Sequence, residues 1–205
     1  NSTNSNGIWF SLDERDTFQL RGSGTAQGIS AYSTLDDETA YLIAGGSVSK
    51  TTTALASGSL SNIFVPSAYY DIAQIGDTLI VVGADGVVQI STDAGSSWEN
   101  LNDGLGIAEL QAFDDIPNVG MIDLRTIKVS PNGQNIVICG QQGFVATSNN
   151  GGLSWTSQNI YSASNTLTKI TFVNNNKVIV AGNGNVDASH NYWTSLDGGL
   201  TFTQA

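Results

Sequence analysis

The chain has 205 residues, with 7 lysines and arginines against 18 aspartates and glutamates, so its formal net charge is -11. Such an acidic surface repels phosphate groups, which argues against partners such as nucleic acid or an anionic membrane surface. Hydrophobic residues make up 40% of the chain, enough for a packed core, but no run of about 18 apolar residues could insert across a membrane.

In chain order, residues 1–7 form a polar tail, and residues 8–205 predict one domain of short strands separated by turns rich in glycine and asparagine. The first two strands are expected at 8–12 and 16–20. Four groups of four follow: 28–33, 39–45, 47–53 and 59–64; 69–75, 78–83, 86–91 and 97–101; 122–130, 135–140, 143–148 and 154–158; 167–173, 177–182, 191–195 and 201–204.

A motif recurs in the last turn of each group, where an apolar run and a glycine are followed by Ser-x-Asp-x-Gly and an aromatic residue. Its first residues lie at 11, 53, 91, 148 and 195, which gives intervals of 42, 38, 57 and 47 residues. This is the length of a four-stranded sheet repeat. The copies at Ser11 and Thr53 are degenerate. The residues assigned to the motif are Ser11, Asp13 and Phe18; Ser91, Asp93, Gly95 and Trp98; Ser148, Asn150, Gly152 and Trp155; and Ser195, Asp197, Gly199 and Phe202.

Each residue type in the motif has a physical role. The aspartate carboxylate can accept hydrogen bonds from backbone N–H groups of its own turn. Glycine adopts a positive φ without strain, and the aromatic residue can pack between neighbouring sheets. An isolated hairpin of this kind is marginally stable, so the sheets are expected to stack around a common axis.

These motifs resemble those of the Asp-box, or BNR-repeat, β-propellers, a superfamily that includes sialidases, sortilin-type receptors and photosystem II assembly factors. The glycine-to-Ser-x-Asp spacing looks most like the last group. The resemblance extends from Ile8 to Phe202 and implies an all-β propeller of about five four-stranded blades, the N-terminal one incomplete. Its Asp-box turns would join the outer strands. Three alternatives would account for the incomplete N-terminal blade. Flanking chain has been removed, another protomer completes the ring, or the blades form an open arc.

The resemblance does not imply sialidase activity for this chain. Sialidases hold a substrate carboxylate with three arginines, and this chain has only Arg15, Arg21 and Arg125. Carboxylate-pair glycosidase chemistry is not excluded, but no two carboxylates are placed together by the sequence. Photosystem assembly factors bind a membrane-protein subunit through one propeller face, whereas the lysines here are scattered along the chain. No catalytic residue is assigned.

The candidate ligand or partner residues are aromatic, acidic or histidine side chains near expected loops. Tyr69, Tyr70 and Tyr192 could stack on a sugar ring or anchor a protein interface. His190 is the only histidine and lies within an insertion between the last two blade motifs. Residues 105–116, which include Phe113, Asp114 and Asp115, interrupt the repeat as a short amphipathic segment suited either to a partner contact or to packing.

No cofactor or metal site is expected. Calcium at the acidic cluster 36–38 or at Asp114–Asp115 is the alternative. Cys139 is the only cysteine, which excludes an internal disulfide and a cysteine-rich zinc site, and its apolar surroundings predict a buried strand end.

The composition favours an extracellular or virion-surface location. The leading hypothesis is a non-enzymatic structural, adhesion or protein-interaction module, such as a phage tail component, with a protein partner or further copies of itself. A glycan-binding lectin is the alternative, and a glycoside hydrolase is the third hypothesis.

Overall fold

A computed structural model describes residues 7–10, 19–23, 29–34, 39–44, 46–52, 61–64, 68–101, 122–161, 165–183 and 191–204. The described strands form one two-stranded and four four-stranded antiparallel sheets. We number the sheets I to V in chain order. None of the described helices is long and apolar enough to cross a membrane.

Each sheet is built from consecutive strands. Sheet I contains β1 (Gly7–Phe10) and β2 (Gln19–Ser23), so β1 begins inside the predicted polar tail. The strands of the other sheets are β3 (Ile29–Thr34), β4 (Ala40–Ala44), β5 (Ser47–Thr51) and β6 (Ser61–Phe64) in sheet II; β7 (Tyr69–Ile75), β8 (Thr78–Gly83), β9 (Val88–Ser91) and β10 (Glu99–Asn100) in sheet III; β11 (Leu124–Val129), β12 (Ile136–Gly140), β13 (Phe144–Ser148) and β14 (Thr156–Asn159) in sheet IV; and β15 (Thr166–Phe172), β16 (Val178–Asn183), β17 (Tyr192–Ser195) and β18 (Thr203–Gln204) in sheet V.

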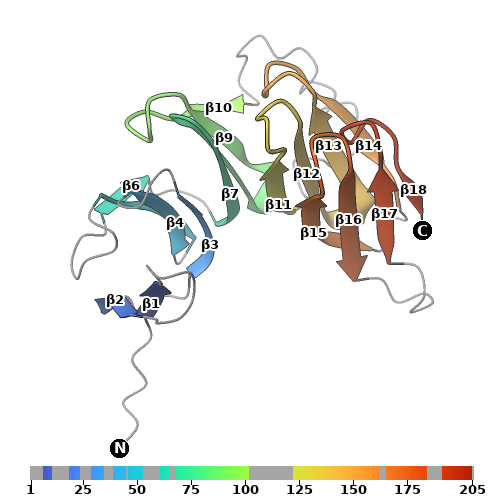
Figure 1. Cartoon of the computed structure of the whole chain (residues 1–205). Helices are drawn as coiled ribbons and strands as arrows, with labels where there is room; N and C mark the ends of the chain where they lie inside the picture. Colours follow the sequence, from blue (N-terminus) through green and yellow to red (C-terminus); the bar gives the residue numbers. More distant parts are fainter. Residues whose placement is uncertain are drawn as a thin grey trace, which may run out of the picture.

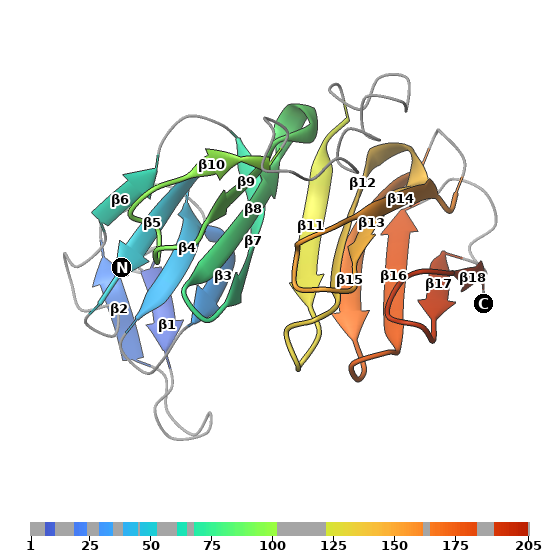
Figure 2. The ribbon, with the colours of Figure 1, turned by 90° about the horizontal axis from the view of Figure 1, so that it is seen from above.

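The sheets stand side by side in an open arc, with their first strands on its inner side (Figure 1). The same order is seen from above in Figure 2, where sheets I and V lie at opposite ends. Contacts between first strands link the sheets, because β7 touches both β3 and β11, and β11 touches β15. The prediction of four complete sheets preceded by an incomplete one is therefore confirmed.

Alternating side chains fill the space between adjacent sheets. In β12, Ile136 and Ile138 pack toward sheet III, whereas Val137 and Cys139 pack toward sheet V. All four side chains are buried. Both faces of a central sheet are apolar because a neighbouring sheet covers each of them. Cys139 lies at a buried strand end as predicted, and burial raises the pKa of its thiol.

In sheets III, IV and V an aromatic residue after the third strand packs into the cluster shared with the preceding sheet. Trp155 is buried between sheets III and IV. Trp98 and Phe202 are half-buried at the corresponding places between sheets II and III and between sheets IV and V. Truncating a buried tryptophan typically costs about 3–5 kcal/mol, so these residues are major contacts between sheets.

The turns between the third and fourth strands of sheets III, IV and V repeat one hydrogen-bond scheme. In sheet III, Ser91 Oγ donates to Asp93 Oδ1 (2.8 Å) and accepts from Gly95 N (2.8 Å), while Ser97 N donates to Asp93 Oδ1 (2.8 Å). Ser195, Asp197 and Gly199 make the same two bonds in sheet V, at 2.7 and 2.8 Å.

In sheet IV an amide replaces the carboxylate. Ser148 Oγ donates to Asn150 Oδ1 (2.9 Å), Gly152 N donates to Ser148 Oγ (2.8 Å), and Asn150 Nδ2 donates to Ser154 Oγ (2.8 Å). The predicted copies at Ser11, Asp13 and Phe18 and at Thr53 lie outside the described residues.

The hydrogen bonds in these turns favour the ionised carboxylates. Bonds donated by the Ser97 side chain and backbone and by Ser91 lower the pKa of Asp93 to about 2. Partial burial alone would raise the pKa of Asp197, but bonds from Ser195 and Thr201 outweigh it and lower that pKa to about 2 as well.

Candidate functional site

Every four-stranded sheet has a β-bulge near the start of its first strand. The pairing register shifts between Tyr69 and Asp71 in β7, between Leu124 and Thr126 in β11, and between Leu167 and Lys169 in β15; β3 shifts in the same way between Ile29 and Ala31. The bulged residues are Ser30, Tyr70, Arg125 and Thr168. A bulge redirects side chains, and bulges are frequent next to binding sites.

A glycine at or near the end of the second strand makes room for the bulge. A Cβ on Gly83, Gly140 or Gly182 would lie under 3.0 Å from a backbone carbonyl oxygen at or just before the start of the first strand. In sheets III and IV the residue after this glycine donates its N–H to the same carbonyl, as Gln141 N does to Asp123 O (2.9 Å). In sheets III to V the glycine that ends the apolar run therefore permits close approach of the two strands.

Tight turns bring further polar groups to this end of the sheets. Asp85–Gly86 and Gln142–Gly143 occupy the corners of the β8–β9 and β12–β13 hairpins, all four with positive φ. This is the type I′ geometry that matches strand twist. It places Asp85 N 3.3 Å from Asp123 Oδ1.

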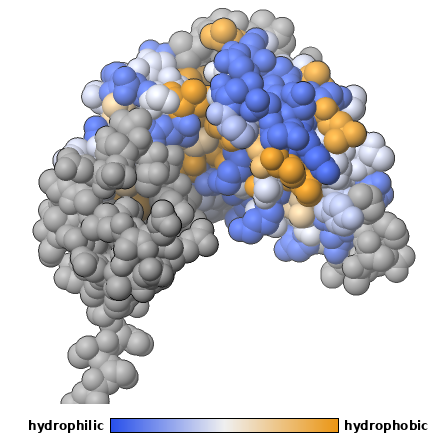
Figure 3. Space-filling model, viewed as in Figure 1, coloured by the Kyte–Doolittle hydropathy of each residue, from blue (hydrophilic) through white to orange (hydrophobic). Residues whose placement is uncertain are grey.

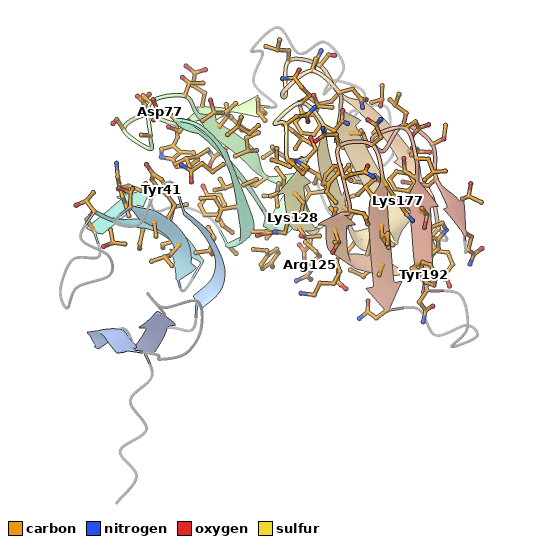
Figure 4. All side chains as sticks on the ribbon, viewed as in Figure 1. Tyr41, Asp77, Arg125, Lys128, Lys177 and Tyr192 are labelled. Atoms are coloured by element: carbon orange, nitrogen blue, oxygen red, sulfur yellow. The ribbon has the colours of Figure 1, made fainter. Side chains whose placement is uncertain are left out.

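Arg125 is the centre of a polar cluster that joins sheets III and IV. Its guanidinium carbon lies 4.5 Å from the ring centroid of Tyr70, and its Nη2 is 2.6 Å from Asp123 Oδ2. Gln141 Nε2 donates to the same carboxylate oxygen (3.2 Å). The Arg125 side chain is 34% exposed. Stacking and ion pairing thus orient a guanidinium that still reaches solvent on the concave side of the arc (Figure 4).

Asp71 fixes the two inner strands below this cluster. Its Oδ2 accepts hydrogen bonds from Thr126 Oγ1 (2.7 Å), Ile127 N (3.1 Å) and Lys128 Nζ (2.7 Å). The Asp71 side chain is 9% exposed and that of Lys128 is 45% exposed. The carboxylate therefore holds β11 against β7 while Lys128 remains in contact with water.

The inner strands β11 and β15 carry three cationic side chains, two of which are ion-paired with aspartates. Three of the chain's seven lysines and arginines lie on β11 and β15: Arg125, Lys128 and Lys169. Lys169 is exposed. The expectation that the lysines are scattered along the chain is not contradicted, since only Arg125 and Lys128 share a strand. The described surface in Figure 3 is otherwise mainly hydrophilic, with apolar residues in separate patches.

The structure separates the three tyrosine candidates. Tyr70 belongs to the cluster. Tyr69 does not suit a surface role, because the bulge leaves it 1% exposed among apolar residues, with its hydroxyl donating to Gln89 Oε1. Tyr192 is 45% exposed on sheet V, away from Arg125 (Figure 4). The other candidates, Phe113, Asp114, Asp115 and His190, lie outside the described residues.

Arg125 and Asp123 were missed as site residues. The sequence signal was available in part, since both flank Leu124 near a predicted strand start, but their partner Tyr70 lies in another sheet. Within the described ranges, no group of three or more His, Cys, Asp and Glu side chains could hold a metal ion. The acidic residues 36–38 proposed for calcium are outside those ranges.

Comparison with known proteins identifies the architecture. No protein-family model matches the chain, and no curated protein matches it. Among solved structures, YCF48 bound to D1 peptide superposes with a TM-score of 0.65 at 13% identity over 95% of this chain and 58% of that one. The GH74 xyloglucanase of Xanthomonas campestris gives 0.61 at 12% identity, over 86% and 30% of the two chains.

A third similar structure is the computationally designed Ika4 protein, with a TM-score of 0.54 at 13% identity over 80% of this chain and 92% of that one. This chain thus spans less than two thirds of the YCF48 and GH74 chains. At these identities the likeness concerns the fold alone. Together with the radial four-stranded sheets, it shows that this chain has a β-propeller fold and that sheets II to V are propeller blades.

Proposed function

We propose that this chain is a non-enzymatic protein-interaction module that binds an extended, acidic polypeptide segment along its inner strands. The observation that carries the proposal is the Arg125 guanidinium, held by Tyr70 and Asp123 at the bulge and open to solvent on the concave side. A guanidinium fixed in this way is suited to a carboxylate, because little side-chain freedom is lost on binding.

The cations on the inner strands are the groups that an acidic ligand would contact. The chain as a whole carries a net charge of -11; Arg125 and Lys128 lie on β11, where each is paired with an aspartate, and Lys169 lies on the adjacent β15. A carboxylate approaching Arg125 can use the guanidinium N–H donors that Asp123 does not occupy. The structure of YCF48 bound to D1 peptide adds that another propeller of this kind binds a peptide.

Fluorescence anisotropy with labelled peptides tests the proposal. The probes are a glutamate-rich peptide with a free C-terminal carboxylate and the same peptide with glutamine at every glutamate. We expect the acidic probe to bind more tightly, and Arg125→Ala to weaken its binding by about tenfold or more, the equivalent of one charged hydrogen bond. The matched control is Lys177→Ala, which removes one cation from the turn between β15 and β16.

Equal binding of both probes, or equal losses in the two variants, would overturn the proposal. Binding on a glycan array that is lost in Tyr192→Ala would instead support the lectin alternative, and turnover of chromogenic glycosides would refute a non-enzymatic role. From the composition we also propose an extracellular or virion-surface, adhesive setting, which immunogold labelling of the source material would test.

A further inference from the structure

A cavity of about 270 Å³ opens between the outer strands of sheet III and the turn that follows β13 in sheet IV. Sheet III lines it with residues of β9, of β10 and of the turn between them, and sheet IV contributes Gly152 and Leu153. Since β9 and β10 are the two strands of sheet III farthest from the inner strand β7, the cavity is separate from the Arg125 cluster.

At the equivalent place between sheets IV and V, two side chains bond to the neighbouring turn. Thr147 Oγ1 donates to Gly199 O (2.8 Å), and Gln158 Nε2 donates to Leu200 O (2.9 Å). The two accepting residues correspond to residues 152–153 of sheet IV, because the turns of the two sheets are 47 positions apart. These bonds fasten the outer strands of one blade to the turn of the next.

The junction between sheets III and IV lacks both of these donors. Sheets III and IV are offset by 57 positions, the interval between the serines that begin their turns. Ile90 and Leu101 therefore stand where Thr147 and Gln158 stand in the next blade. Neither has a side chain that donates a hydrogen bond, and both line the cavity. The cavity thus lies where the two bridging side chains are replaced by apolar ones.

One part of the lining is apolar. Leu101 is 2% exposed and belongs to the cluster shared by sheets III and IV, and Ile90 packs against that cluster. Leu153, from the opposite blade, is 76% exposed. An apolar floor with an exposed leucine beside it leaves apolar surface that a bound ligand would remove from water.

The polar part of the lining offers mainly hydrogen-bond acceptors. Glu99 is exposed and pairs with Ile90, so that the two side chains share one side of the sheet. Ser97 Oγ donates to Asp93 Oδ2 (2.6 Å), which leaves the hydroxyl oxygen free to accept. Thr92 adds a second hydroxyl. Among the described lining residues, Glu99 alone carries a charge.

We propose that this cavity binds a short-chain primary amine, whose ammonium contacts Glu99 and Ser97 and whose alkyl chain covers Leu153. An ammonium has three donors and no acceptor, which matches a carboxylate beside hydroxyl oxygens. The net charge of -11 attracts cations to the molecule as a whole. The volume is below the range of about 300–1,000 Å³ that drug-sized ligands occupy, so a small amine fits it best.

NMR titration of the full chain with pentylamine, added as its hydrochloride at about pH 7, tests this site. We expect saturable shifts of the Glu99, Gly152 and Leu153 amide signals at millimolar amine. Pentan-1-ol, which has the same chain and no charge, should bind about fivefold more weakly. Glu99→Gln should weaken amine binding by about the same factor and abolish the preference for the amine. The matched control is Asp77→Asn, which removes one charge from an exposed turn of the same sheet.

A second variant tests the apolar contact separately. Leu153→Ser, at an exposed side chain whose loss should leave the fold intact, should weaken the binding of amine and alcohol alike. Circular dichroism establishes that each variant is folded. The proposal is overturned if pentylamine causes no saturable shifts at the cavity, if the amine and the alcohol bind the wild type equally, or if Glu99→Gln and Asp77→Asn have equal effects.

Discussion

Replacing Asp71 by alanine should destabilise the contact between sheets III and IV. The change removes the acceptor for the Thr126 hydroxyl and the Ile127 N–H, which are 5% and 0% exposed as residues. Leaving one buried donor unsatisfied costs about 1–3 kcal/mol. The half-exposed Lys128 adds only about 0–1 kcal/mol, because its ammonium can be rehydrated.

The net loss of stability is smaller than the sum of the costs for the two unsatisfied donors and the lost ion pair. The reason is that the variant no longer carries the desolvation cost of a buried carboxylate. We therefore expect the free energy of unfolding to fall by about 3 kcal/mol, which corresponds to roughly 6–12 °C in Tm for a chain of this size. Urea unfolding followed by circular dichroism measures the loss directly.

The matched control is Asp77→Ala, which removes the same charge from an exposed aspartate in the turn after β7 (Figure 4). A surface change of this kind should alter the free energy of unfolding by no more than about 0.5 kcal/mol. If Asp71→Ala costs no more than its control, Asp71 does not hold the two blades together and the argument from its hydrogen bonds is wrong.

Two further predictions concern the glycine and the turns. Gly140→Ala should lower the free energy of unfolding in urea by about 3 kcal/mol, because its Cβ would lie under 3.0 Å from a backbone carbonyl oxygen although its own φ is extended. The control Gly76→Ala, at φ +57° with nothing within 4 Å, should cost about 1 kcal/mol. Equal losses in the two variants would contradict this reasoning. Asn150→Asp should raise stability near neutral pH by giving sheet IV the carboxylate turn of the other two. The pKa of Asp93 and of Asp197 is about 2 in the folded chain against 3.8 in the unfolded one, so the stabilisation by such a carboxylate is complete above pH about 4 and is lost as the pH falls through 2. A gain from Asn150→Asp that persists in unfolding measurements at pH about 2 would refute the prediction.

The strands could be predicted because local signals agree with one another. Apolar runs of four to six residues end at a glycine, as at Gly83 and Gly140, and turn residues follow at fixed spacing, so β8 and β12 lie within one residue of their predicted bounds. Several strands are shorter than expected: β4, β5, β9 and β11 each lose two or three residues, and the outermost strands β10 and β18 keep only two. β10 contains Glu99 and Asn100 alone, because an edge strand has a partner on one side only.

The site could not be predicted in the same way, because it is made by packing between blades. Tyr69 and Tyr70 are adjacent and chemically identical, and the sequence offers no reason to choose between them. The bulge places the two tyrosines in different environments, because it buries Tyr69 and leaves Tyr70 beside Arg125. Tyr70 and Arg125 are 55 positions apart in the sequence, so no local pattern indicates their contact.

The division between constant and variable residues suggests where specificity resides. The glycine at or near the end of each second strand and the bulge beside it recur from sheet III to sheet V, and the backbone contact that they share is the same in each blade. The bulged residue itself changes from Tyr70 to Arg125 to Thr168. A repeat that fixes the backbone and varies one outward side chain separates stability from recognition. Ligand preference should therefore respond to substitutions at the bulged positions, whereas substitutions in the third-to-fourth-strand turns should change stability.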